Sequence, residues 1–196
     1  MPTELLTVGH GTQSADALAA LLAGAGVSAL VDVRIAPGSR RNPQFMRAEL
    51  ERWLPAAGIG YRWDKRLGGY RRLAADSPDT ALRNESFRAY AGYMRTAEFA
   101  AGLADLIAQA RQERTAVMCS ETVWWRCHRR LIADHLLLLD GLVPLHLMPG
   151  GRLSEHRPTS GVRVADGTLV YDQSDATVTP PNPSGRGTAL AQGGPQ

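Results

Sequence analysis

The sequence has few cysteines and lacks a long apolar run. Its 196 residues include two cysteines, at 119 and 127, which is a poor framework for disulfide bonds. The densest apolar stretch, at 135–148, is interrupted by Asp140, Gly141 and Pro144, so it does not supply the roughly 20 apolar residues of a membrane span. The first ten residues lack the basic start of a secretory signal. We therefore expect a cytoplasmic protein with no membrane partner.

Familiar phosphate- and metal-binding motifs are also absent. The chain has no P-loop and no G-x-G-x-x-G, and the stretch GHGT at 9–12 is too short to count as either. The H-x-E and P-C-x-x-C pair of the zinc deaminases is missing as well. These absences exclude the commonest nucleotide-binding loops and deaminase chemistry.

Lysine is scarce, and arginine supplies nearly all of the positive charge. Lys65 is the only lysine among 22 basic residues, and the formal net charge is +3. A GC-rich genome explains an arginine-rich total, but it does not explain why the basic residues cluster between 34 and 72, where only Glu49, Glu51 and Asp64 oppose them. Clustered arginine is suited to bidentate binding of phosphate or carboxylate, so we expect an anionic partner.

Apolar runs that predict strands alternate with helical patterns along the chain. The strands are expected at 4–9, 28–34, 59–63, 115–120 and 142–148, with helices between them at 14–26, 46–57, 84–94, 97–112 and 127–141. This alternation predicts an α/β fold, a three-layer sandwich with a mostly parallel central sheet of about five strands.

The pattern changes after residue 157. Alternating apolar residues surround Asp166-Gly167, a dipeptide that favours a type I′ hairpin turn. Beyond it the chain is rich in proline, glycine and serine, which is typical of a flexible segment. We therefore expect an α/β domain at 1–157, a C-terminal β-hairpin extension at 158–174 and a disordered tail at 175–196.

Chemically active residues follow the predicted strands at their carboxyl ends, where an open parallel sheet binds its ligands. The expected catalytic residues are His10, Cys119, Glu121, Cys127 and His128. The expected anion-binding residues are Arg34, Ser39, Arg40, Arg41 and Arg129.

The stretch CSETVWWRCHRR at 119–130 carries both cysteines. Cys127 is at the predicted start of a helix among arginines, and both the helix dipole and the positive charge lower the pKa of a thiol there. Two alternatives stay open: Cys119 is a small apolar residue of the core, and Cys127 is an inert helix cap. Glu121 is either a general acid or base, or a partner of the helix dipole and the arginines.

A metal site made by Cys119, Cys127 and His128, with His10 or His146, is a further alternative. The C-x7-C-H spacing is not a standard zinc pattern, and adjacent residues rarely ligate one ion together. We therefore predict no metal, and the sequence leaves any cofactor open. His135, in the middle of an apolar helical pattern, is expected to be structural.

Several segments together resemble the domain of unknown function 488 family. The matching pieces are TVGHGT, LVDVRIAPGSRRNPQF, GIGYRWDKRLGG, VMCSE, CHRRLIADHL and GLVPLHL, in the family's order across about residues 5–148. The resemblance implies a compact three-layer α/β domain, and it carries the family pattern onto His10, Arg34, Ser39, Cys119, Glu121, Cys127, His128 and Arg129. It implies no reaction.

Two functions are therefore expected from the sequence. The first is an enzyme that acts on an anionic small molecule, a nucleotide or another phosphorylated metabolite, by cysteine-dependent rather than metal-dependent chemistry. The alternative is a non-catalytic module that binds a nucleotide or nucleic acid, with the arginines on phosphates and Trp63, Trp124 or Trp125 stacked on bases.

Overall fold

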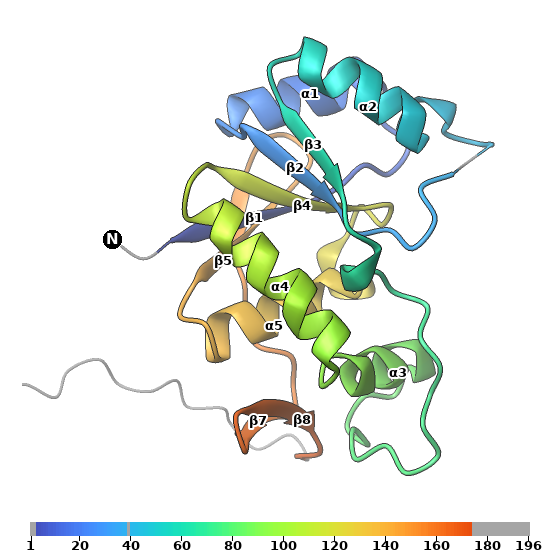
Figure 1. Ribbon diagram of the computed structural model, residues 1–196, viewed down its shortest axis with the longest axis vertical. Coiled ribbons are helices and arrows are strands. Elements are labelled where there is room, and N and C mark those ends of the chain that lie inside the picture. The colour runs from blue at the N-terminus through green and yellow to red at the C-terminus, as the bar shows by residue number, and fades with distance from the viewer. Residues whose placement is uncertain (1–2, 39, 174–196) are drawn as a thin grey trace, which may run out of the picture.

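The computed structural model describes residues 3–38 and 40–173. Its centre is a six-stranded sheet in the order β3-β2-β4-β1-β5-β6 (Figure 1). The strands are β1 (Glu4–Gly9), β2 (Ala29–Asp32), β3 (Gly60–Trp63), β4 (Thr115–Cys119), β5 (Val143–Leu147) and β6 (Leu153–Glu155). The first five run parallel, as predicted, and β6 is an antiparallel edge strand that the sequence pattern did not indicate.

Helices cover both faces of the sheet and complete the predicted three layers. One face packs against α1 (Ala15–Gly24) and α2 (Arg47–Ala56), and the other against α3 (Glu85–Tyr93), α4 (Ala97–Ala110) and α5 (Arg129–Leu138). The short 3₁₀ helices are η1 (Pro43–Phe45), η2 (Lys65–Leu67) and η3 (Trp124–Arg126). Successive residues of β1 point to opposite faces, so Leu5 joins the core under α3–α5 and Leu6 the core under α1–α2.

Local signals set where the helices begin. Ser14 caps α1, and its hydroxyl accepts a hydrogen bond from the backbone N–H of Ala17 at 3.1 Å. The helix expected at 127–141 begins later, at Arg129. Cys127 and His128 therefore lie in the loop that leads into α5 rather than inside the helix.

The strand order creates a crevice at the carboxyl end of β4. This strand lies between β1 and β2, and the chain leaves those two neighbours along the face of α1 and α2. It leaves β4 along the opposite face, through α5. Connections that diverge in this way open a ligand crevice outside the carboxyl ends of the strands.

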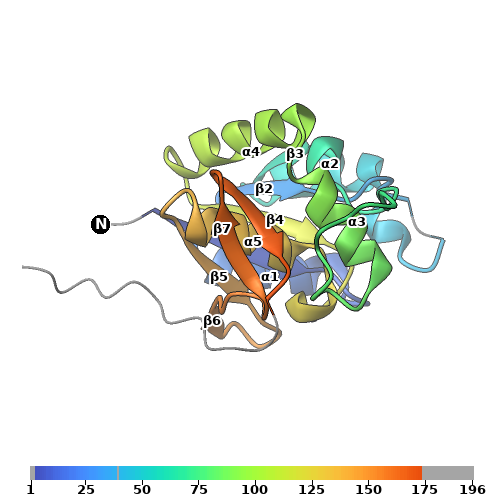
Figure 2. The ribbon, with the colours of Figure 1, turned by 90° about the horizontal axis from the view of Figure 1, so that it is seen from below.

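The predicted hairpin is present as β7 (Val162–Ala165) and β8 (Thr168–Tyr171). Both turn residues, Asp166 and Gly167, have positive φ, as a type I′ turn requires. Figures 1 and 2 show the hairpin against α5, on the side away from the sheet. Val162, Leu169 and Tyr171 are buried in the same core as α3–α5, so the extension shares the core of the α/β domain.

The predicted tail at 175–196, together with residue 174, lies outside the described residues. Within residues 3–38 and 40–173, no helix has both the length and the apolar character needed to cross a membrane.

We expect Tyr171→Phe to destabilise the protein by about 1–3 kcal/mol, because it removes the donor to a buried carboxylate oxygen. The Tyr171 hydroxyl donates to Asp134 Oδ2 at 3.0 Å, and both residues are fully buried. Urea unfolding measures the loss. Val164→Ala, at a hairpin position that is 50% exposed, is the control and should change stability little; equal effects of the two variants would show that the hydrogen bond contributes nothing.

Candidate functional site

A pocket of about 730 Å³ lies at the carboxyl ends of β1, β2 and β4. Six of the predicted site residues line it: His10, Arg34, Cys119, Glu121, Cys127 and His128. Arg129 is buried behind Cys127, while Arg40 and Arg41 are exposed on the loop that carries Gly38 and Asn42 to the pocket. Ser39 lies outside the described residues. The predicted edge of the sheet thus gathers residues from four separate segments.

The two cysteines meet at the floor of this pocket. Cys119 ends β4 and Cys127 precedes α5, and both are buried and free of disulfide bonds. A hydrogen bond to Cys127, together with burial, raises the pKa of Cys119 to about 12. Burial acts to raise the pKa of Cys127 as well, but the bond from Cys119 and the charge of Arg129 outweigh it and lower that pKa to about 6. The pair therefore favours ionisation of Cys127 over ionisation of Cys119.

Arg129 holds the thiolate and the loop that precedes it. Its side chain is 1% exposed, and its Nε donates to Cys127 Sγ at 3.3 Å. Its Nη2 donates to the backbone carbonyl of Glu121. This carbonyl lies directly on Gly9, where an added Cβ would be only 1.9 Å from the Glu121 oxygen. The end of β1 must therefore be glycine for the 120–126 loop to fold back onto it.

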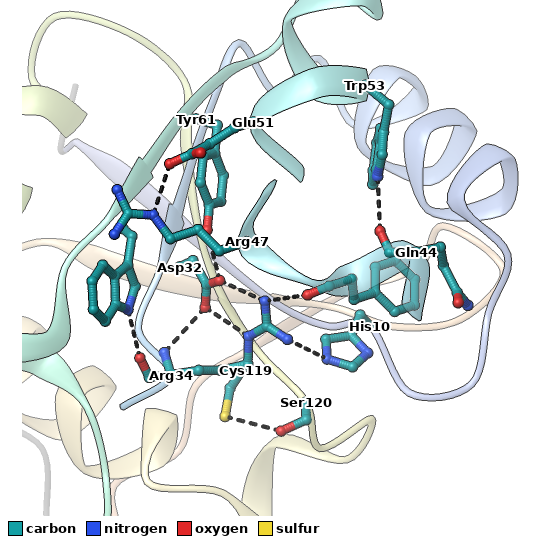
Figure 3. Close-up of polar contacts among 12 residues, drawn as sticks. His10, Asp32, Arg34, Gln44, Arg47, Glu51, Trp53, Tyr61, Cys119 and Ser120 are labelled. Carbon is teal, nitrogen blue, oxygen red and sulfur yellow. Dashed lines mark hydrogen bonds and ion pairs between the residues drawn. The ribbon is translucent and has the colours of Figure 1, made fainter. Parts of the chain in front are cut away.

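A second buried ion pair forms the neighbouring wall (Figure 3). Asp32 accepts two hydrogen bonds from the Arg34 guanidinium, at 2.6 and 2.8 Å, and one from the Tyr61 hydroxyl at 2.9 Å. Arg34 also donates to the carbonyl of Phe45 and, at 3.2 Å, to His10 Nε2. The carboxylate of Asp32 therefore offsets most of the charge of Arg34. Arg34 contributes a fixed polar side chain to the pocket wall and is not a free cation.

His10 is held in one neutral form by its neighbours. Its Nδ1 donates to the carbonyl of Gly11 at 2.9 Å, which leaves Nε2 to accept from Arg34. Burial, followed by the charge of Arg34, lowers the pKa of His10 to about 4. Because both ring nitrogens are engaged, His10 orients Arg34 and has no free nitrogen to exchange a proton with a ligand.

Glu121 and His128 are two polar groups of the pocket with unused hydrogen-bonding capacity. Glu121 is exposed at the pocket, and its carboxylate has no partner among the described residues. His128 Nδ1 lies 3.7 Å from Cys127 Sγ, and its buried Nε2 has no hydrogen-bond partner in the described part of the chain. The His128 ring packs on Gly69 and on Tyr90, with ring centroids 4.9 Å apart in the latter pair.

Cys119, Cys127 and His128 lie close enough together to bind a single metal ion. One ligand atom from each of Cys119, Cys127 and His128 lies within 4.8 Å of the other two. Two sulfurs and an imidazole suit zinc. However, Cys127 Sγ already accepts a hydrogen bond from Arg129. The guanidinium therefore places beside this sulfur the positive charge that a metal ion would otherwise provide.

Tyr70 is a residue at the pocket that the sequence reasoning missed. Its side chain is 89% exposed and its φ is 57°, a left-handed conformation that is rare outside glycine. Gly69 packs on His128, and Arg71 is held by the carbonyls of Gly68 and Lys65, so both neighbours fix the backbone. Strain of this kind is concentrated at functional sites. The signal in the sequence was an aromatic residue inside a glycine- and arginine-rich loop.

One family model matches the sequence. The model, described as Domain of unknown function DUF488, covers residues 14–136 and includes all of the predicted site residues except His10. This match confirms the resemblance seen in the sequence motifs. No match was found to a curated protein or to a solved structure.

We expect Cys119→Ala to raise the pKa of Cys127 above about 6, because the substitution removes the hydrogen bond that stabilises the thiolate. The ultraviolet absorbance of the thiolate, followed against pH, reports this pKa directly and does not depend on access to the sulfur. Ser120→Ala, next to Cys119, is the control and should leave the first titration step in place. An unchanged midpoint in Cys119→Ala would mean that Arg129 alone sets the pKa.

Proposed function

The chain belongs to the DUF488 family, whose description assigns no activity, and we propose that it is an enzyme that acts on an anionic small molecule through the Cys127 thiolate. A nucleotide or another phosphorylated metabolite is the substrate class. Cys127 is the nucleophile, Cys119 holds the neighbouring proton, and Glu121 transfers protons at the pocket.

One observation carries this proposal: Cys127 lines a pocket, and its sulfur accepts a hydrogen bond from the buried guanidinium of Arg129. The pKa of Cys127 is lowered to about 6 although the residue is buried. Burial alone raises the pKa of a structural cysteine instead. The thiolate is held by Arg129 and by the Cys119 thiol, which is the kind of support that an activated nucleophile needs.

Free cations for the substrate lie at the exposed side of the pocket. Arg126 lines the pocket and is exposed, and its guanidinium has no acidic partner within the described residues. Arg40 and Arg41 add charge from the neighbouring loop. Arg34 and Arg129 are engaged with Asp32 and Cys127, so we assign these two the positioning of the site and assign Arg126, Arg40 and Arg41 the attraction of the anion.

The proposed reaction consists of two successive displacement steps. Cys127 Sγ forms a bond to the electrophilic atom of the substrate as the bond to the leaving group breaks, and Glu121 relays a proton from solvent to the leaving group. Water then attacks the covalent intermediate and loses a proton to Glu121, which releases the product and restores the thiolate. A reducing compartment such as the cytoplasm keeps both cysteines available for this cycle.

We expect Cys127→Ser to abolish turnover and covalent adduct formation while the melting temperature stays nearly unchanged. Intact-mass measurement after incubation with a panel of nucleotides and phosphorylated metabolites detects the adduct, and Cys119→Ser should reduce its rate without abolishing it. A large loss of stability in Cys127→Ser, with ligand binding intact, would identify Cys127 as a packing residue. A stoichiometric metal that is lost in Cys127→Ser, found in protein purified without chelator, would also overturn the proposal.

Tyr70 favours a second candidate, the binding of a nucleotide or of single-stranded nucleic acid without catalysis. Two of the three tryptophans expected to stack on bases are engaged elsewhere: Trp63 donates to the Arg34 carbonyl, and Trp124 stacks on His146 with centroids 4.0 Å apart. Tyr70 instead presents an open ring beside the pocket. Base stacking on an exposed aromatic ring, with arginines on phosphates, is a common mode of single-strand recognition.

In this second function, Tyr70→Ala should weaken binding of a short single-stranded oligonucleotide by about tenfold, in line with roughly 1–3 kcal/mol for one stacked base. Fluorescence anisotropy at several salt concentrations measures it, and affinity should fall steeply as salt increases. Trp125→Ala removes an aromatic side chain that is 47% exposed and does not line the pocket, so it is the control. Salt-independent binding, or equal effects of both variants, would exclude this candidate.

A further inference from the structure

A second pocket, of about 450 Å³, is lined by residues that directly follow Tyr70 in the chain, beginning with Arg71. It is formed by the 71–78 segment, α3 and the start of α4, and it shares no lining residue with the pocket of the cysteines. Its lining contains four arginines, Arg71, Arg72, Arg88 and Arg95. This concentration of guanidinium groups lies outside the site described above.

Two of these arginines are fixed by the protein itself. Arg95 forms a bidentate ion pair with the buried carboxylate of Asp79, at 3.1 and 2.6 Å. Arg71 donates to the carbonyls of Gly68 and Lys65, and its guanidinium lies 3.6 Å from the centroid of the Tyr93 ring. Arg95 is thus neutralised, while Arg71 keeps its full charge because its partners are carbonyls and a ring.

The other two arginines have unused donors. Arg88 Nε is buried and has no hydrogen-bond partner among the described residues. Arg72 is exposed and forms no ion pair within the same part of the chain. The acidic residue of the pocket lining is Asp76, which is exposed. The net charge of the lining is therefore positive, because it includes Arg71, Arg72 and Arg88. Guanidinium groups that line one pocket without an acidic partner favour an anionic ligand.

We propose that this pocket is a binding site for a tetrahedral oxyanion, the phosphoryl group of a small molecule or free phosphate. Arg88 and Arg72 would donate to its oxygens in the geometry that guanidinium groups adopt with phosphate. The positive end of α4, which begins at Ala97 next to the lining residue Thr96, adds a favourable potential. The site is separate from the thiolate chemistry and does not depend on it.

Inorganic phosphate is the probe, and the Arg88 Nε–Hε resonance in ¹⁵N NMR spectra is the readout. Arg88→Lys identifies this resonance by its loss. Addition of phosphate to the full-length protein should shift it along a saturating curve, whereas chloride at equal ionic strength should not. Adenosine monophosphate, titrated in parallel, distinguishes a phosphoryl group carried by a metabolite from free phosphate.

The charge-matched variants are Arg88→Gln and Arg52→Gln. Arg52 is exposed on α2, where it pairs with Glu49, and its loss should leave phosphate affinity unchanged. Arg88→Gln should weaken the affinity measured at the resonances of Arg72 and Thr96 by at least about tenfold, because it removes a charge-assisted hydrogen bond. A linear, unsaturated shift, a static Arg88 resonance, or equal affinity in both variants would overturn the proposal.

Discussion

The buried guanidinium of Arg129 is the interaction on which the arrangement of the site depends. A charge that is 1% exposed requires close partners, and Arg129 has two, the Cys127 sulfur and the Glu121 carbonyl. The first sets the ionisation of the thiol and the second sets the path of the loop between the cysteines. The electrostatics and the backbone of the site are therefore stabilised by the same side chain. Removal of either partner would leave a buried charge incompletely compensated, so thiolate and loop conformation should form together.

At the end of the neighbouring strand β2, a buried charge is also compensated within the protein. Asp32 and Arg34 neutralise each other, and Tyr61 and His10 complete their hydrogen bonds. These groups give the pocket a polar wall of fixed shape and little net charge. The charge that faces solvent comes instead from loop residues such as Arg126. In the proposed function, this separation lets an anion approach from outside without competing for the ion pairs that hold the wall.

The grouping of these residues at one edge of the sheet could be predicted from the sequence, but the partner of each side chain could not. Alternating strands and helices predict which strand ends share an edge, and Cys119, Cys127 and Arg34 do line one pocket. Whether an arginine faces a ligand or the interior depends on groups far away in the chain. His10 and Phe45, for example, supply partners to Arg34. The edge strand β6 has three residues and no apolar alternation, so it carries no strand signal before β5 is placed beside it.

Residues beyond the family match also support the site. His146 Nε2 lies 3.0 Å from His156 Nδ1, and His156 Nε2 lies 2.8 Å from Asp134 Oδ1. Burial lowers the pKa of His146 to about 3, so its ring is neutral where Trp124 stacks on it at 4.0 Å. Trp124 begins η3, the turn that immediately precedes Cys127. The contacts from the core through His146 to Trp124 thus fix one end of the loop, and Arg129 fixes the other. Together they explain how a short segment can hold the two sulfurs within 4.8 Å of each other.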